Sequence, residues 1–312
     1  MANIRVANAP CSWGSLEFEG LAGESIAYGQ MLDELRESGY VGTELGDWGY
    51  MPTEPSTLKM ELERRHLSMV AAFVPVALKH LDAHARGEAE ALKVAQLLAA
   101  VSDTSAGAQR PLLILADANG TDVTRTRYAG RVTAKMGLNQ SEWKIFASGA
   151  ERIARTVRDM TGLRTAFHHH CAGYIESPIE IARFLDMTDP DLIGLVFDTG
   201  HYLFGTGRTD GGDVLDGLDR FARRIWHVHF KDCQPQIAEQ ARTEGWDYFT
   251  SLQHGVFCEL GKGIIPFTGV VERLRRNDYH GWIVVEQDIL PGMGSPKESA
   301  ERNRAYLRAI GL

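Results

Sequence analysis

The sequence predicts a (β/α)8 barrel, an α/β fold in which eight parallel strands each precede a helix. Short apolar runs alternate with longer amphipathic segments along the chain, and several of the runs end in a histidine or a carboxylate. Strict alternation of strand and helix is typical of a parallel sheet, and eight such units in 312 residues are typical of a closed barrel. The expected strands are 4–8, 41–45, 68–76, 111–116, 164–170, 193–198, 225–230 and 282–287. The expected helices lie near 24–38, 55–66, 87–102, 141–160, 178–186, 213–223, 267–276 and 296–309.

Two of these helices have a complete start signal. Ser177-Pro178-Ile179-Glu180 and Ser295-Pro296-Lys297-Glu298 each combine a serine cap, a proline at the first helical position and a glutamate three residues after the serine. This pattern predicts a capping box, in which the serine and the glutamate accept hydrogen bonds from each other's backbone amides. Gly39 and Gly162 are expected to end the helices that precede them.

The composition is that of an ordinary globular protein, with 44% hydrophobic and 24% charged residues. Barrels of this length commonly form one domain, so residues 1–312 are expected to be a single domain. The formal net charge of -8 argues against a nucleic-acid or membrane surface. The longest apolar runs are shorter than the roughly 20 residues that span a bilayer.

The cysteines predict a cytoplasmic protein with reduced thiols. None of the four forms a CxxC pair, and their spacing suggests neither a zinc ribbon nor a disulfide framework. No apolar segment of a signal peptide follows Met1–Arg5. The sequence leaves open whether the chain forms a homo-oligomer.

Two connections are longer than a barrel turn requires. Residues 117–140 follow the fourth strand and contain Arg125, and residues 233–263 follow the seventh and contain Trp246, Tyr248 and Phe249. Both lie on the side of the barrel where active sites form. Long loops in this position are commonly lids or binding walls.

Three strand ends carry candidate metal ligands. Asp198 closes an apolar strand, and Glu286 follows another, where an unpaired carboxylate would be costly to bury. His227 and His229 share one strand face, and His229 lies nearer the carboxyl end. Imidazole and carboxylate are suitable ligands for zinc, manganese, cobalt or iron. The alternatives are a helix-capping aspartate at 198 and a buried histidine bonded to a backbone carbonyl at 229.

Other polar residues are candidates for substrate binding or proton transfer. His201 lies three residues after Asp198, and Lys231 lies two after His229, where it could hold a substrate oxygen. Glu44 ends the second strand and could bind substrate or support the metal ligands. In the triplet His168-His169-His170, the outer two share a face; one ligand with two hydrogen-bonded histidines is as plausible as two inward functional groups.

Two aromatic residues are candidates for a pocket wall. Trp13 and Phe73 are expected at the ends of the first and third strands. Aromatic faces pack against the C–H surfaces of sugar and cyclitol rings. Both residues could equally be ordinary core residues.

Several segments resemble inosose (2-keto-myo-inositol) dehydratases and the wider xylose isomerase-like superfamily, over nearly the whole chain. The segments that resemble the dehydratases are Asn8–Gly14, Gly42–Gly46 and His168–Gly173. Those that resemble the superfamily, which also contains sugar epimerases, isomerases and a class of apurinic endonucleases, are Phe197–His201, His227–Asp232 and Val285–Glu286.

The resemblance implies one divalent ion, manganese or cobalt before zinc or iron. Carried over by motif, its ligands would be Asp198, His229 and Glu286, with His168 as the fourth, where many relatives have glutamate. It also implies a small polyol or keto-sugar substrate, and a lyase that dehydrates a keto-cyclitol or keto-sugar. In this interpretation, Glu286 removes the proton next to the carbonyl and His170 or His201 protonates the departing hydroxyl.

Other functions remain open at this point. The main alternative is a metal-dependent epimerase or isomerase of a free or phosphorylated ketose, which shares the first proton abstraction. Elimination from a 3-keto-glycoside would also suit the site. An endonuclease is disfavoured by the charge of -8, and a non-catalytic sugar-binding barrel would not need Asp198 and Glu286 together.

Overall fold

A computed structural model describes residues 4–14, 26–102, 109–290 and 294–312. Its strands form a closed barrel in the order β1-β10-β7-β6-β5-β4-β3-β2, and every neighbouring pair is parallel. The predicted (β/α)8 barrel is therefore confirmed. The barrel strands are β1 (Ile4–Asn8), β2 (Gly42–Glu44), β3 (Ser68–Val76), β4 (Leu112–Asp117), β5 (Thr165–His168), β6 (Ile193–Asp198), β7 (Ile225–Phe230) and β10 (Gly281–Val285).

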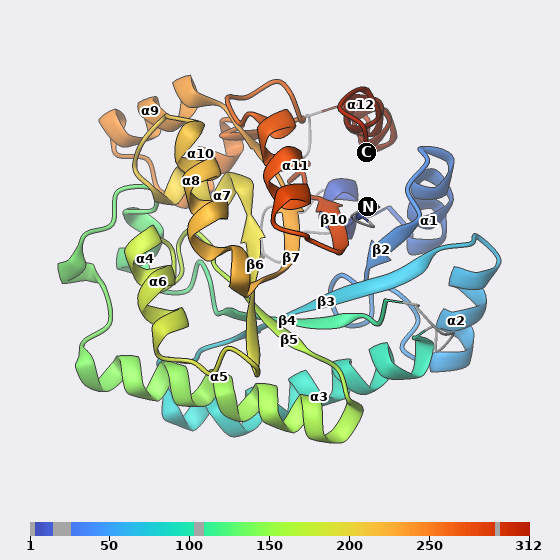
Figure 1. Ribbon diagram of the computed structural model, residues 1–312, viewed down its shortest axis with the longest axis horizontal. Helices are drawn as coiled ribbons and strands as arrows, with labels where there is room; N and C mark the ends of the chain where they lie inside the picture. Colours follow the sequence, from blue (N-terminus) through green and yellow to red (C-terminus); the bar gives the residue numbers. More distant parts are fainter. Residues whose placement is uncertain (1–3, 15–25, 103–108, 291–293) are drawn as a thin grey trace.

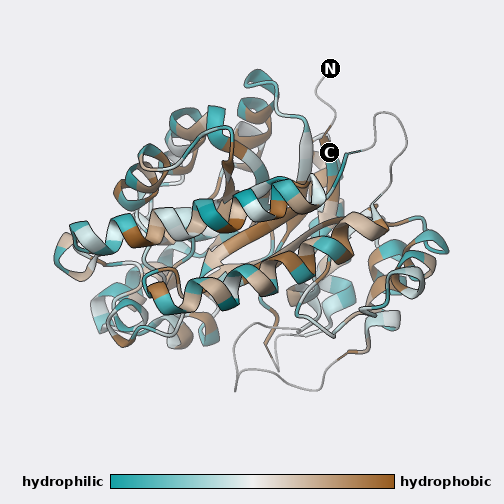
Figure 2. Ribbon diagram, turned by 90° about the horizontal axis from the view of Figure 1, so that it is seen from below, coloured by the Kyte–Doolittle hydropathy of each residue, from teal (hydrophilic) through white to brown (hydrophobic). Residues whose placement is uncertain are grey.

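Helices surround this barrel (Figure 1), and α3 and α5 pack side by side along one flank. Figure 2 shows these helices in front of hydrophobic strands, with hydrophilic residues along their outer faces. Such amphipathic helices bury one stripe against the sheet and leave the other in water. The helices that connect successive strands are α1 (Tyr28–Glu37), α2 (Pro55–Glu63), α3 (His84–Val101), α5 (Gln140–Thr161), α6 (Pro178–Asp186), α8 (Gly212–Phe221), α11 (Phe267–Arg276) and the last helix, α12 (Pro296–Ala309).

Two tryptophans fill the amino-terminal end of the barrel. Trp226 and Trp282 pack with the inward-facing apolar residues of the strands. Glycines make room for them: a Cβ on Gly194 would lie 2.1 Å from the Trp226 ring, and one on Gly42 would lie 2.9 Å from the Trp282 ring. Any side chain at these positions would clash. The barrel interior is therefore packed with side chains at this end.

The long connections form small substructures at the carboxyl ends of the strands. The β4–α5 connection contains α4 (Val123–Arg127) and a 3-10 turn (Ala134–Met136). The β7–α11 connection contains β8 (Asp232–Cys233), α9 (Pro235–Glu244), α10 (Tyr248–Gln253) and β9 (Phe257–Cys258). After β6 the chain turns directly into α7 (Thr199–Gly205). The remaining 3-10 turns are Pro10–Trp13, Leu81–Ala83 and Ala222–Arg224.

Several predicted boundaries were wrong by a few residues. The strand expected at 164–170 ends at His168, because the amide of His170 turns away to bond the carbonyl of Ile175. The strand expected at 41–45 is limited to Gly42–Glu44. The helix expected at 24–38 begins at Tyr28, and residues 24–25 lie outside the described residues.

The helix starts are confirmed in one case and half confirmed in the other. Ser177 and Glu180 form the complete capping box. At Ser295 the side chain accepts the amide of Glu298, but the Glu298 carboxylate faces Arg302, 3.7 Å away, so the second bond of the box is not made. Gly162 ends α5 in the left-handed conformation, with φ of 70°.

Each of the four cysteines is a free thiol that forms no disulfide. None of the helices in the described part of the chain has the length and apolar character that crossing a bilayer requires.

Candidate metal centre

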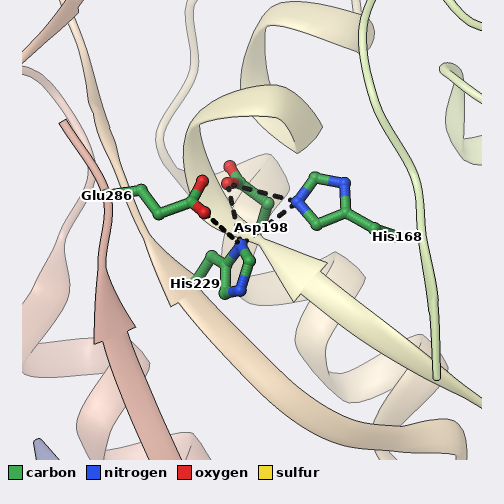
Figure 3. Close-up of side chains that lie close together, drawn as sticks. All are labelled: His168, Asp198, His229 and Glu286. Carbon is green, nitrogen blue, oxygen red and sulfur yellow. Dashed lines mark hydrogen bonds and ion pairs between the residues drawn. The ribbon is translucent and has the colours of Figure 1, made fainter. Parts of the chain in front are cut away.

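Four side chains from consecutive strand ends converge at the carboxyl-terminal mouth of the barrel (Figure 3). His168 ends β5, Asp198 ends β6, His229 lies in β7 and Glu286 directly follows β10. One ligand-type atom of each lies within 4.8 Å of the others. These are the four residues that the sequence analysis named as metal ligands.

The register of the strands explains this convergence. Asp198 is paired with His229 across β6 and β7, and the amide of Glu286 bonds the carbonyl of Phe230, next to His229. His168 lies one strand further, in register with Val196. Parallel strands place their carboxyl ends at one edge, so four residues far apart in the sequence become neighbours.

The donor set fits a divalent ion. The Oδ2 atom of Asp198 is buried without a hydrogen-bond partner in the described part of the chain, whereas its Oδ1 accepts the amide of His201 at 2.7 Å. A buried oxygen without a partner is costly, and a cation at this point would satisfy it. Ligand atoms about 2.0–2.2 Å from one ion lie at most about 4.4 Å apart. The observed spread therefore needs only a small contraction to hold a metal.

Glu44 lies behind the cluster and orients His229. Its Oε1 is 3.0 Å from Nε2 of His229 and 2.9 Å from Nε2 of His227. The Nε2–H of His229 therefore donates to Glu44, and Nδ1 faces the cluster, 3.3 Å from Oε1 of Glu286. Nδ1 of His168 has no such partner among the described residues, so His229 is the more firmly oriented imidazole.

The charges around the four-residue cluster favour a bound cation. Burial disfavours the imidazolium of His229, but the carboxylates of Glu286 and Glu44 outweigh it and raise its pKa well above the usual value. Burial likewise opposes the ionised form of Glu286, but His229 and Lys231 hold its pKa well below the usual value. Because a ligand imidazole must be neutral, a metal ion would take the place of a proton on His229.

Two further histidines pack against each other beside the cluster, with their ring planes tilted by 37°. The rings of His170 and His201 are 3.8 Å apart, and that of His201 is 5.8 Å from the ring of His168. Burial, and then the neighbouring positive groups, lower the pKa of both His170 and His201 well below the usual value, so both rings are neutral.

The two neutral rings differ in tautomer. The amide of Cys171 donates to Nδ1 of His201 at 3.4 Å, so the ring proton of His201 lies on Nε2. This Nε2 is buried without a partner in the described residues. His170 instead donates from Nδ1 to the carbonyl of Cys171 at 2.5 Å, and its Nε2 lies 3.5 Å from the Tyr248 hydroxyl.

Lys231 lies between two carboxylates at the rim of the cluster. Its Nζ is 3.0 Å from Oδ2 of Asp288 and 3.4 Å from Oε2 of Glu286. Burial works against its charge, but Asp288 and Glu286 raise its pKa well above the usual value. Lys231 also lies over the ring of Phe257, 5.0 Å from its centroid.

The sequence analysis did not assign roles to Asp288, Tyr248 or Phe257. Asp288 lies two residues after Glu286, and this period-two spacing could have identified it. Tyr248 and Phe257 come from the β7–α11 connection, whose path the sequence does not reveal. That connection was expected to form a binding wall, and these two residues are where it meets the site.

The two aromatic candidates lie in different layers. Phe73 packs edge-on against His168, with ring centroids 5.9 Å apart, and therefore borders the cluster. Trp13 belongs to the 3-10 turn Pro10–Trp13, is 1% exposed, and donates from its indole to Glu34 of α1 at 2.8 Å. Trp13 thus packs between barrel and helices, the core placement that the sequence analysis had left open.

Comparisons with known proteins agree with this architecture. A family model described as xylose isomerase-like TIM barrel matches residues 32–310. An inosose dehydratase of Lacticaseibacillus casei is 31% identical over 306 residues, which are 98% of this chain and 97% of that protein.

The solved structure of a probable 3-DHS dehydratase, AsbF, from Bacillus anthracis aligns with 97% of this chain and 98% of its own length, with a TM-score of 0.67 and 14% identity. A D-allulose 3-epimerase from Methylomonas sp., solved with D-allulose, covers 99% and 98% with a TM-score of 0.66 and 14% identity. At these identities the two structures show the fold alone.

Proposed function

The chain belongs to the inosose dehydratase family of xylose isomerase-like TIM barrels, and we propose that it is a metal-dependent hydro-lyase that dehydrates a keto-cyclitol such as 2-keto-myo-inositol. The observation that carries the proposal is the four-residue cluster with an unpartnered buried Asp198 oxygen, bordered by neutral imidazoles. Similarity to an inosose dehydratase over nearly the full length of both chains supports the substrate class. Such a substrate would place the protein in inositol catabolism, and we retain the expected cytoplasmic location.

His168, Asp198, His229 and Glu286 would hold the ion. Two imidazoles in this set favour manganese, cobalt, zinc or iron over magnesium, and we propose manganese or cobalt first. When bound, the ion supplies Lewis acidity that acidifies the C–H next to a ketone. Glu44 contributes by keeping Nδ1 of His229 directed at the site.

The chain's own residues then account for the loss of water. Glu286 takes the proton from the carbon next to the ketone, and the electron pair of that C–H bond is first delocalised into the ketone as an enolate. In a second step this electron pair forms a C=C bond as the neighbouring C–O bond breaks. The departing hydroxyl takes a proton from His201 or His170 and leaves as water. Lys231 holds a substrate oxygen at the rim of the cluster, and Phe73 borders the substrate ring.

An epimerase or isomerase remains the alternative, because it begins with the same proton abstraction. The discriminating experiment loads the protein with manganese or cobalt and supplies 2-keto-myo-inositol in deuterated water. A hydro-lyase produces an enone or dione chromophore, whereas an epimerase exchanges the proton and retains all oxygen atoms. Proton exchange without water loss from any keto-cyclitol or keto-sugar would replace the present proposal.

Metal analysis of Glu286→Ala tests the site itself. The variant is expected to lose its bound metal, while Glu63→Ala on the exposed surface of α2, whose side chain is 66% exposed, keeps it. Full metal occupancy in Glu286→Ala would contradict the assignment.

A further inference from the structure

We infer that Arg125, together with the β4–α5 segment 117–130 around it, positions His170 for the chemistry of the site. The inference rests on the proposed function, because the His170 ring lies 3.8 Å from that of His201 and the two together supply the candidate proton donors. Arg125 is fully buried and touches none of the four candidate ligands in the contacts of the described residues. Its contacts point instead to the loop 169–177, which leads from the end of β5 to α6.

The segment 117–130 holds the loop 169–177 by three bonds to the loop's backbone and one to the side chain of Glu176. A carboxylate, a guanidinium and two main-chain amides of the segment reach successive residues of the loop. The contacts are Asp117 Oδ2 with the amide of Tyr174 (2.9 Å), the amide of Gly120 with the carbonyl of Ala172 (3.1 Å), Nε of Arg125 with the carbonyl of Gly173 (2.7 Å), and the amide of Gly130 with Oε1 of Glu176 (2.7 Å). The loop is thus tied at each residue from 172 to 174 and again at 176.

Arg125 is the central residue of this arrangement. Besides bonding Gly173, its guanidinium forms a two-bond fork with Glu180, at 2.9 and 3.0 Å. Glu180 in turn accepts the amides of Glu176 and Ser177 at 3.1 and 2.9 Å. One guanidinium therefore fixes both the bend of the loop and the first turn of α6, and only the planar fork of arginine can make all these bonds together.

The loop needs such external support because part of its backbone is strained. Ala172 has φ of 66°, a left-handed conformation that residues with a Cβ rarely adopt. Its amide is held by Oε2 of Glu176 at 2.9 Å. The bend at Ala172 turns the chain back, so that His170 bonds Ile175 and its ring packs against that of His201.

The consequence is a positioning role for a residue remote from the reaction. A displacement of about 1 Å in a reacting group can cost about 100-fold in rate. Arg125→Lys keeps the charge but cannot bond Gly173 and both oxygens of Glu180 at once. We expect kcat to fall about 10–100-fold with little change in KM, while His168, which ends β5 before the loop, retains its metal.

The matched control is Arg65→Lys. Arg65 is 5% exposed and makes the same kinds of bond, from Nε to Asp33, from Nη1 to Glu61 and from Nη2 to the carbonyl of Gly29. Two of these partners, Gly29 and Asp33, lie on α1 and the third, Glu61, lies on α2, so all are remote in the sequence from the loop 169–177. Arg65→Lys therefore tests whether removing the hydrogen bonds of any buried arginine lowers kcat simply by destabilising the fold.

The experiment reads the His170 ring directly as well as turnover. Wild type, Arg125→Lys and Arg65→Lys are labelled with ¹⁵N-histidine, loaded with zinc as a diamagnetic ion, and compared by long-range ¹H–¹⁵N spectra, with His170→Asn identifying the His170 signals. We expect these signals to move in Arg125→Lys alone.

Unmoved signals, or equal movement and equal loss of kcat in Arg65→Lys, would overturn the inference. Moved signals in a protein that dehydrates no keto-cyclitol would support the positioning while refuting the proposed function. If Arg125→Lys does not fold, Glu180→Gln, which weakens the same fork, is measured in its place with the same expected result.

Discussion

Glu44 bonds the ring nitrogen of His229 that faces away from the candidate metal centre, at 3.0 Å. The same oxygen bonds His227, so one buried carboxylate holds two imidazoles of β7. Burial alone would raise the pKa of Glu44, but the two histidines outweigh it and lower the pKa to about 2. Glu44 therefore stays ionised over the physiological range. It fixes the tautomer of His229 by accepting the Nε2 proton, which leaves Nδ1 directed at the candidate metal centre.

Removing this carboxylate is expected to weaken metal binding. Partners behind a ligand histidine typically contribute about 10–100-fold in metal affinity, so Glu44→Ala should lose about that factor in a chelator competition titration. Glu44→Gln keeps an oxygen acceptor for His229 and should lose less. Wild-type affinity in Glu44→Ala would show that Glu44 serves another purpose, such as binding substrate.

Metal removal is expected to lower thermal stability in a manner that depends on Asp198. A ligand present at 100 times its Kd stabilises the folded state by about 2.7 kcal/mol. Chelation of the metal-loaded wild type should therefore lower Tm, and restoring the metal should reverse the change. In Asp198→Asn, where an oxygen can still accept the His201 amide, chelation should leave Tm unchanged. An equal Tm shift in the variant would place the ion elsewhere.

Much of the fold could be predicted from the sequence because it depends on local patterns. Alternating apolar runs locate the strands, and a capping box locates the start of α6. The strand expected to end at 170 stops at His168 for a reason that is not local: the loop 169–177 is shaped by Asp117, Arg125 and Gly130 from a distant connection. The spacing of the three histidines, 168 to 170, gives no information about these hydrogen-bond partners.

The candidate site was predictable to the extent that strand ends determine it. Asp198, His229 and Glu286 each end an apolar run, so the barrel alone brings them together. The role of Glu44 depends on the pairing of its side chain across the barrel with β7, and that of Trp13 on a 3-10 turn that directs the indole to Glu34. Such side-chain partnerships follow from tertiary packing and leave no trace in the order of residue types.

Lys231 and Asp288 are expected to depend on each other. Lys231→Gln removes the cation between two half-buried carboxylates, so the protein should lose stability and bind substrate more weakly. Adding Asp288→Asn removes one of the unpaired charges and should restore much of the stability. Urea unfolding and steady-state kinetics separate the two effects. If the double variant also recovers the wild-type KM, Lys231 contacts no substrate oxygen.

Glu176 is expected to make stability depend on pH. Burial raises its pKa to about 7 despite the lowering effect of Arg125 and of two backbone amides. Since the folded-state pKa lies above the unfolded value, the native state binds more protons between about pH 4.5 and 7, and stability falls as pH rises through this window. The shift corresponds to about 3 kcal/mol.

The test compares Glu176→Gln with wild type by urea unfolding near pH 5 and near pH 8, in the presence of metal. The variant should lose a pH-independent amount, because its amide must face the amide of Gly130 or Ala172. In addition, the free energy of unfolding of the variant should vary with pH by about 3 kcal/mol less than that of wild type. Parallel pH profiles for the two proteins would mean that Glu176 is ionised throughout, held by Arg125.

His201 is expected to be the group that protonates the departing hydroxyl. Its Nδ1 accepts the amide of Cys171, so Nε2 carries the proton, and this Nε2 is buried without a partner in the described residues. His170 has the opposite tautomer, with its Nδ1 proton committed to the carbonyl of Cys171. Of these two rings, His201 is therefore the one whose ring proton is held by no acceptor among the described residues. A positioned acid contributes about 10²–10⁴-fold.

The two possible substitutions of His201 distinguish its two nitrogens. His201→Asn places an amide near the Nδ1 position and can still accept from Cys171, but it has no donor where Nε2 was, so kcat should fall by about 10²–10⁴-fold. His201→Gln reaches further and can donate near the Nε2 position, which should recover part of the loss. Exchange of the α-proton into solvent should persist in both, because that step is proposed for Glu286, and metal content should be unchanged. If His201→Asn dehydrates at the wild-type rate while His170→Asn does not, the proton comes from His170 after its ring changes tautomer. Wild-type rates in both variants would exclude both imidazoles and leave Lys231, the remaining protonated group beside Glu286, as the donor to test.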